Sequence, residues 1–160
     1  ERGGSIKAER LKQELKRVER LLESGIRGES DDFSLNKIRT ELARLEISVE
    51  SLSHTEMRVV SQLEAEGGEP GPEASVLKVE HTEIMQRITE LAMTALGPYG
   101  AILELERGQS LDKFHDQVGQ IAIDMLPIVP RYLNFRAATI YGGSNEVQRN
   151  IIAKNALQLP

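Results

Sequence analysis

The sequence predicts an all-α fold: an antiparallel four-helix-bundle-like domain with a shorter helix at its C-terminal end. Three observations support this fold class. Apolar residues recur at steps of three and four, glycine and proline clusters separate the periodic segments, and no segment alternates apolar and polar residues with a period of two. A chain of 160 residues can bury one core, and we expect a single domain over residues 1–160.

The first two expected helices are defined by apolar stripes on a charged background. Residues 5–24 carry a stripe formed by Leu11, Leu15, Val18 and Leu22. Glycines at 25 and 28 end this helix, and a second begins close to Ser34 with a seam formed by Leu35, Ile38, Leu42, Leu45, Val49 and Leu52. The seam continues through Val59 and Leu63 after an interruption at Glu56. Two glycines and two prolines within residues 67–72 end the second helix.

A third helix and two shorter ones complete the expected bundle. Pro72 suits the first position of the third helix, whose buried face contains Val76, Val79, Ile84, Ile88, Leu91 and Ala95. The Gly-Pro-Tyr-Gly segment at 97–100 ends it. Prolines 127 and 130 prevent a long helix over residues 101–130, where short helical pieces and loops are expected. A short helix over 131–139 and a terminal helix over 145–157 follow.

Composition excludes several classes of function. The net charge of -5, from 25 acidic and 20 basic residues, argues against a general nucleic-acid-binding protein. The absence of cysteine excludes disulfides and thiolate metal sites, and no apolar run approaches the length of a membrane span. The three histidines, at 54, 81 and 115, lack metal-ligand spacing, so we assign no metal. We expect a cytoplasmic protein without a membrane or nucleic-acid partner.

The turn Gly142-Gly143-Ser144 stands before the terminal helix and has two interpretations. Glycines let backbone N–H groups converge, Ser144 can cap the helix, and the N–H groups of a first helical turn attract a phosphate or another anion. An ordinary turn and cap is the commoner explanation of such a sequence. Glu146 would repel a phosphate placed close to it, which favours contact with a hydroxyl or an amide instead.

At these residues the chain resembles a known family. Residues 140–153 resemble the C-terminal signature of the acyl-CoA dehydrogenases, Ile-Tyr-Glu/Gly-Gly-Thr/Ser-Asn/Ser-Glu/Gln-Ile/Val-Gln-Arg. Residues 67–78 resemble the family's linker and helix start, and residues 96–100 stand where it has a glycine-rich loop beside the flavin. The resemblance covers essentially the whole chain and implies the C-terminal helical domain of such an enzyme.

The resemblance implies a flavoenzyme that binds FAD and oxidises the bond between the α and β carbons of an acyl-CoA thioester. Gly142, Gly143, Ser144 and Glu146 are then the cofactor-binding residues, and the Gly142 N–H stabilises the thioester oxygen as it gains charge. The implied partners are the acyl-CoA substrate, an electron-transfer flavoprotein or similar acceptor, and further subunits. These subunits form a homodimer or homotetramer, or include a heteromeric paralogue.

The catalytic base is a separate question, because many family members carry a catalytic glutamate at the position of Gly142. Other members place it before the first helix of this domain, in a Leu-Glu-Arg or Phe-Glu-Arg context. The chain begins Glu1-Arg2, so Glu1 is the candidate catalytic base. The alternative interpretations are that Glu1 is merely the first residue of a fragment, and that the chain belongs to a non-catalytic subunit.

Other departures from the family pattern indicate whether residues 1–160 can be active without further domains. The Arg-x-x-Phe-Gly motif that reaches the flavin of a neighbouring subunit has no counterpart between Ile26 and Phe33, and the Gly-Gly-x-Gly loop is reduced at 97–100. The family's N-terminal helical and middle β domains do not fit within 160 residues. We therefore expect an inactive fragment of a longer enzyme, with a helical oligomerisation or interaction module as the alternative.

Overall fold

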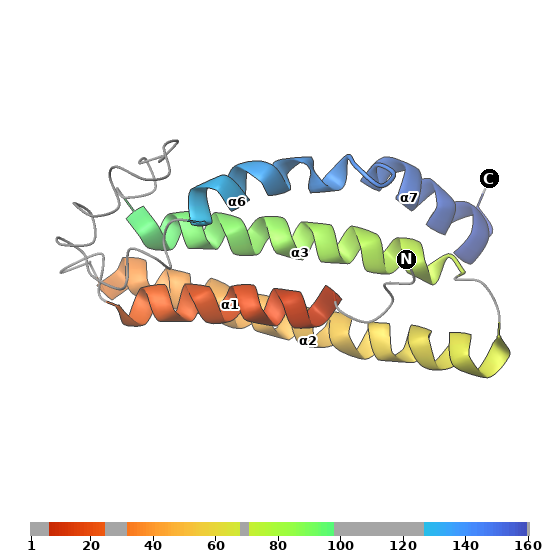
Figure 1. Ribbon diagram of the computed structural model, residues 1–160, viewed down its shortest axis with the longest axis horizontal. Helices are drawn as coiled ribbons and strands as arrows, with labels where there is room; N and C mark the ends of the chain where they lie inside the picture. The colour runs from red at the N-terminus through yellow and green to blue at the C-terminus, as the bar shows by residue number, and fades with distance from the viewer. Residues whose placement is uncertain (1–6, 25–31, 68–70, 98–126, 160) are drawn as a thin grey trace.

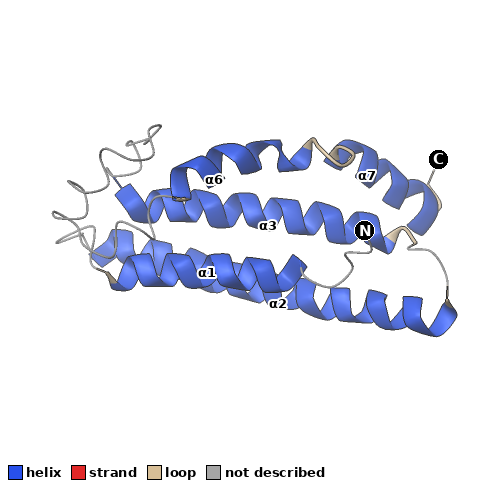
Figure 2. Cartoon of the chain, viewed as in Figure 1, coloured by secondary structure: helices blue, strands red, loops and turns tan. Residues whose placement is uncertain are grey.

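A computed structural model describes residues 7–24, 32–67, 71–97 and 127–159, and these residues form an all-α bundle (Figures 1 and 2). The expected fold class is confirmed, and the described residues include no β-strand. The predictions for residues 98–126 and for Glu1 concern residues outside the described ranges. None of the described helices combines the length and the apolar character that crossing a membrane requires.

Within the described residues, the bundle consists of three long helices and one composite helical segment. The long helices are α1 (Lys7–Glu23), α2 (Asp32–Glu66) and α3 (Glu73–Leu96). The fourth segment comprises α6 (Ile128–Phe135), the 3₁₀ helix η2 (Arg136–Thr139), α7 (Asn145–Ile151) and the π-helix η3 (Ile152–Ala156). Successive long elements run in opposite directions, with α1 and α2 on one side of α3 and the C-terminal segment on the other (Figure 1).

The core lies around α3, which packs against α1, α2, α6 and α7. Apolar side chains from all of these layers except α7 form one contiguous cluster, and burying each of its larger side chains stabilises the fold by about 1.5–3 kcal/mol. The members with 1% exposure or less are Leu11, Val18, Leu45, Val49, Met85, Ile88, Ala95 and Leu96. The predicted apolar stripes of the first three helices are therefore the stripes that build the core.

The helix boundaries differ from the predicted ones by only a few residues. The second helix begins at Asp32 rather than near Ser34, and Pro72 occupies the cap position, so that the third helix begins one residue later than expected. On α3, Val76 is half-buried rather than buried, whereas Met85, which was not predicted, is fully buried. The structure describes the first helix only from Lys7.

Glu56 stays within the seam of α2 although it interrupts the apolar pattern. Its side chain is buried, and its Oε2 atom accepts a hydrogen bond from the backbone N–H of Ala8 at 3.1 Å. The first N–H groups of a helix have no partner within the helix, and a buried carboxylate is stable only when such donors surround it. Glu56 therefore caps α1 from the neighbouring helix.

The predicted helix over 131–139 has the wrong start. The helix begins at Ile128, and Pro130 lies in its first turn rather than before it. A proline there causes no loss of hydrogen bonding, because the N–H groups of the first turn have no intrahelical acceptor. The predicted terminal helix is also divided, since α7 ends at Ile151 and a π-helix continues to Ala156.

Glu14 is buried although it belongs to the charged background of α1. Its two carboxylate oxygens accept hydrogen bonds from Arg131 Nη1 of α6 at 2.6 and 2.8 Å. Arg17 contacts the same carboxylate at 3.3 Å. The ion pair joins α1 to α6 across the bundle, where a carboxylate without a partner would be costly.

We predict that Glu14→Ala lowers the free energy of unfolding by about 2 kcal/mol, because Arg131 then loses its partner in a half-buried position. Urea denaturation followed by circular dichroism measures this loss. The control is Glu23→Ala, which removes an exposed carboxylate from the same helix and should change the stability by less than about 0.5 kcal/mol. Equal losses in the two variants would show that the buried pair contributes nothing specific.

Candidate functional site

The turn between η2 and α7 is an exposed backbone feature with two glycines in the left-handed region. The φ angles of Gly142 and Gly143 are 67° and 86°, values that side chains other than glycine rarely adopt. A Cβ atom on Gly142 would meet no other atom within 4 Å, so the space beside this residue is open. A Cβ on Gly143 would lie 2.6 Å from Gln148 Nε2. The turn therefore exposes main chain rather than side chains.

Ser144 caps α7, as the sequence predicts. Its Oγ accepts a hydrogen bond from the Val147 N–H at 3.4 Å, and its backbone is extended. Glu146 folds back over the same cap. Hydrogen bonds from its own backbone N–H and then from the Ser144 hydroxyl lower the pKa of the Glu146 carboxyl, which is therefore charged at neutral pH.

The turn is attached to α3 through a buried polar cluster. Lys78 Nζ donates hydrogen bonds to the Gly143 carbonyl oxygen and to Asn145 Oδ1, both at 2.7 Å. Asn145 is only 2% exposed, and its Nδ2 donates to Thr82 Oγ1 at 3.2 Å and to Glu83 Oε1 at 3.3 Å. All of the side-chain hydrogen-bonding groups of Asn145 thus find their partners on α3.

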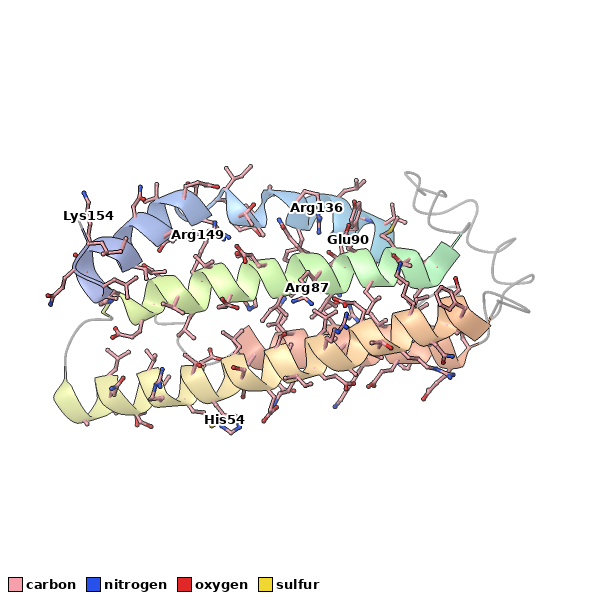
Figure 3. The ribbon with its side chains drawn as sticks, turned by 180° about the vertical axis from the view of Figure 1, so that it is seen from behind. His54, Arg87, Glu90, Arg136, Arg149 and Lys154 are labelled. Carbon is pink, nitrogen blue, oxygen red and sulfur yellow. The ribbon has the colours of Figure 1, made fainter. Side chains whose placement is uncertain are left out.

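Side-chain hydrogen bonds and an ion pair also hold the rest of the C-terminal segment on α3. Gln86 Nε2 donates to the carbonyl oxygens of Phe135 and Arg136 at 3.0 and 3.3 Å, and Arg136 Nη2 donates back to the Gln86 carbonyl at 2.8 Å. Arg149 of α7 forms an ion pair with Glu83. Figure 3 shows Arg136 and Arg149 on the C-terminal segment, facing the α3 layer.

Three amide groups at the turn are available to a ligand. The backbone N–H groups of Gly142, Gly143 and Ser144 make no hydrogen bond within the described part of the chain. An exposed turn with unused donors and an adjacent hydroxyl can bind carbonyl or hydroxyl oxygen atoms. A metal is a poorer match, since the residues that the structure covers include no group of three potential carboxylate or histidine ligands.

Of the predicted cofactor-binding residues, Gly142, Gly143 and Ser144 lie on this turn and Glu146 lies in the first turn of α7 that follows it. Glu1 lies outside the described residues. The sequence reasoning missed Lys78 and Asn145. A weak signal was present, because Lys78 and Thr82 are polar residues one helical turn apart on a helix whose other stripe is apolar. Nothing local in the sequence pairs them with a residue more than 60 positions away.

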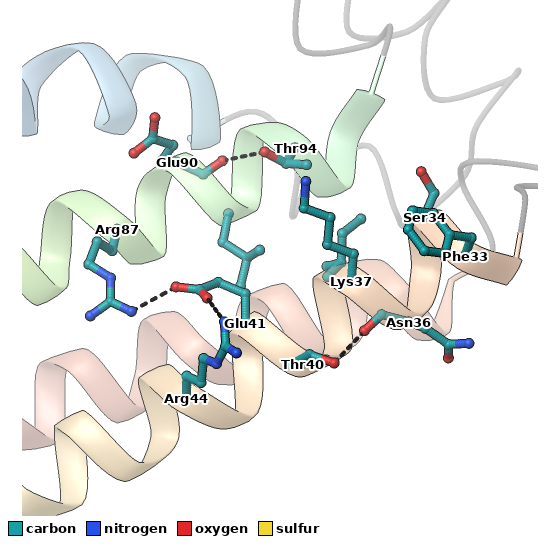
Figure 4. Close-up of a pocket in the computed structure, with 12 residues that line it drawn as sticks. Phe33, Ser34, Asn36, Lys37, Thr40, Glu41, Arg44, Arg87, Glu90 and Thr94 are labelled. Carbon is teal, nitrogen blue, oxygen red and sulfur yellow. Dashed lines mark hydrogen bonds and ion pairs between the residues drawn. The ribbon is translucent and has the colours of Figure 1, made fainter.

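A second concave region lies between the start of α2 and the end of α3 (Figure 4). This pocket has a volume of about 770 Å³, and its charged groups are largely committed to one another. Glu41 accepts a hydrogen bond from Arg87 at 2.7 Å and contacts Arg44 at 3.6 Å; the bond from Arg87 lowers the pKa of the Glu41 carboxyl. None of the predicted site residues lines this pocket, so the turn is the better candidate site.

Comparisons with known proteins identify the family to which most of the chain is similar. The family model described as "Acyl-CoA dehydrogenase, C-terminal domain" matches residues 32–157. A similar protein from Mycolicibacterium smegmatis, acyl-CoA dehydrogenase IpdE1, is 43% identical over 60 residues, covering 29% of this chain and 15% of the relative. The protein of the same name from Mycobacterium tuberculosis is 72% identical over 29 residues, covering 18% and 8%. The matched stretches are thus a small part of each relative.

We predict that Asn145→Ala lowers the free energy of unfolding by about 2–3 kcal/mol, because it removes the buried amide that hydrogen-bonds to Lys78, Thr82 and Glu83 of α3. Chemical denaturation measures the change. Asn150→Ala is the matched control, since Asn150 is exposed on the same helix and should tolerate the substitution within about 0.5 kcal/mol. Similar stability of the two variants would contradict an anchoring role for Asn145.

Proposed function

Because this chain belongs to the acyl-CoA dehydrogenase family through its C-terminal domain, we propose that the protein containing it is an FAD-dependent acyl-CoA dehydrogenase. The reaction would oxidise the bond between the α and β carbons of an acyl-CoA thioester. The chain of residues 1–160 would be one domain of that enzyme and inactive by itself. The relatives that share its sequence extend well beyond the matched stretches, in keeping with this division.

The observation that carries the proposal is the set of unused amides on the Gly142 turn. As the α proton leaves, negative charge develops on the thioester oxygen, and a preorganised N–H donor lowers the energy of that state. The Gly142 N–H would be this donor. Because Gly142 has no Cβ and open space beside it, a flat thioester can approach its backbone closely.

The same turn fits a flavin better than a phosphate. Glu146 is charged and lies beside the cap, so it would repel a phosphate but accept a hydrogen bond from a hydroxyl group. The free amides of Gly143 and Ser144 offer donors within the same turn. We therefore propose that Gly142, Gly143, Ser144 and Glu146 contact the ribityl and ring portion of FAD and the adjacent thioester.

In the proposed reaction, the bound flavin supplies the acceptor for a hydride from the β carbon. The Glu1 carboxylate would accept the α proton, and the electron pair of the broken α C–H bond would form the new carbon–carbon double bond. An electron-transfer flavoprotein or similar acceptor would then reoxidise the cofactor. We place the enzyme in the cytoplasm as an oligomer of this subunit or of this subunit with a paralogue.

A non-catalytic subunit is the second candidate, and one observation favours it. Gly142 carries no carboxylate at the position where many relatives in the family hold their base. In that case the domain would serve as a helical oligomerisation module, and another subunit would provide the base.

The first experiment separates these functions in the full-length protein. Purified enzyme should retain FAD, and an anaerobic titration with acyl-CoA thioesters of different chain lengths should bleach the visible absorbance of the flavin. A non-catalytic subunit would bind flavin without being reduced. Failure to bind flavin, alone or with any co-expressed paralogue, would overturn the enzyme assignment.

A second experiment tests the base. Glu1→Gln should retain FAD and lower the rate of flavin reduction by about 10²–10⁴-fold, because the amide cannot accept the α proton. The control is Glu9→Gln, which changes an exposed carboxylate in the first turn of α1 and should leave the rate unchanged. Full activity in Glu1→Gln would remove Glu1 from this role.

A further inference from the structure

The Gly142 turn has little packing of its own to hold its shape. Two of its residues lack side chains, and Tyr141 before them is 53% exposed. At its start, the N–H groups of Ile140 and Tyr141 both donate to the Ala137 carbonyl, and at its end the Ser144 carbonyl accepts a hydrogen bond from the Gln148 N–H of α7. Among the residues that the structure covers, Lys78 alone hydrogen-bonds to the backbone of Gly142 and Gly143.

Lys78 is well suited to hold this backbone because it is itself held. Its ammonium group bonds to Gly143 and to Asn145 at the same distance of 2.7 Å, and Asn145 is fixed by Thr82 and Glu83. Hydrogen bonds from a charged donor are stronger than neutral ones. The nearby carboxylates are Glu146, whose pKa Lys78 helps to lower, and Glu83, which pairs with Arg149.

The contact determines which way the peptide between Gly143 and Ser144 faces. In a trans peptide the carbonyl and N–H point in opposite directions. Since the Gly143 carbonyl points to Lys78 on α3, the N–H of the same peptide, which belongs to Ser144, points away from α3. The cation also polarises this peptide and makes its N–H a stronger donor.

We propose that Lys78 is a positioning residue, which holds the Gly143 carbonyl on α3 and so maintains the conformation of the turn in which the Gly142 and Ser144 amides face the thioester and flavin. The catalytic part of this inference rests on the proposed function. The mechanical part does not, because it concerns only the conformation of the turn.

The mechanical part can be tested by proteolysis of the full-length protein. Chymotrypsin cleaves after tyrosine, and Tyr141 directly precedes the turn. Lys78→Met removes both charge-assisted bonds while keeping an unbranched side chain, and it should accelerate cleavage after Tyr141 by on the order of 10-fold, because proteolysis follows the population of the open turn. Mass spectrometry identifies the cleaved bond. Unchanged cleavage would overturn the inference.

Two further variants separate positioning from general stability. Thr82→Val removes a hydroxyl that bonds to Asn145 without touching the Gly143 carbonyl, so it should destabilise the protein with less effect on cleavage after Tyr141. Lys16→Met removes an exposed lysine from α1 and should behave as the wild type. If Lys78→Met does not fold, Lys78→Gln retains a neutral donor and should show an intermediate increase in cleavage.

The catalytic part requires a ligand that can lose its α proton but cannot be oxidised. The 3-thia analogue of whichever acyl-CoA reduces the wild-type flavin has this property, because sulfur replaces the β carbon. A pH titration of the bound analogue, followed by its charge-transfer absorbance with the flavin, gives the pKa of the α proton. Lys78→Met should raise that pKa by about 1 unit, and Thr82→Val should leave it near the wild-type value.

The possible outcomes remain distinct. A wild-type protein that binds no flavin and deprotonates no analogue refutes the proposed function, while the cleavage rates still decide whether Lys78 holds the turn. Faster cleavage with an unchanged pKa of the α proton would refute the catalytic role of the contact. Faster cleavage with a raised pKa supports both parts.

Discussion

The buried amide of Asn145 is the contact on which the C-terminal segment depends. Each of its polar groups meets a partner on α3, and leaving one such group unsatisfied would cost about 1–3 kcal/mol. Only a placement of α7 that brings Asn145 opposite Lys78 and Thr82 satisfies all of them. Hydrogen bonding thus gives α7 a register that its apolar contacts would define poorly, because none of the buried apolar residues comes from α7.

Comparable polar anchors occur where the other helices meet. Seams of leucine, isoleucine and valine join α1, α2 and α3, and such seams tolerate displacement along the helix axis more readily than a directional bond does. Glu56 caps the start of α1 from α2, and Glu14 pairs with Arg131 across the bundle. Each anchor is a buried carboxylate that accepts a directional hydrogen bond from another helix. Apolar burial therefore provides most of the stability, and the buried polar groups select the alignment.

Because apolar burial stabilises the bundle and polar contacts align its helices, an exposed glycine turn can keep a defined shape. α3 is fixed on one side by the apolar core and presents Lys78, Glu83 and Gln86 to the C-terminal segment on the other. The outward face of that segment leaves Ile140 and Val147 at least half exposed. An apolar outer face beside unused backbone donors suits a domain that forms one wall of a larger active site, as the proposed function requires.

The sequence by itself determined the all-α fold class, the apolar stripes of the long helices and the helix cap at Ser144. It also determined that Gly142, Gly143 and Ser144 form one turn. These features depend on residues within a few positions of one another, where helical periodicity and backbone preferences act directly. Only the tertiary structure decided that Glu14 and Glu56 are buried, that Pro130 lies inside α6 and that Lys78 meets Asn145. The polar partners in these contacts are 117, 48 and 67 residues apart. No local pattern encodes such pairs, because a charged residue on a helix looks the same in sequence whether it faces water or a distant partner.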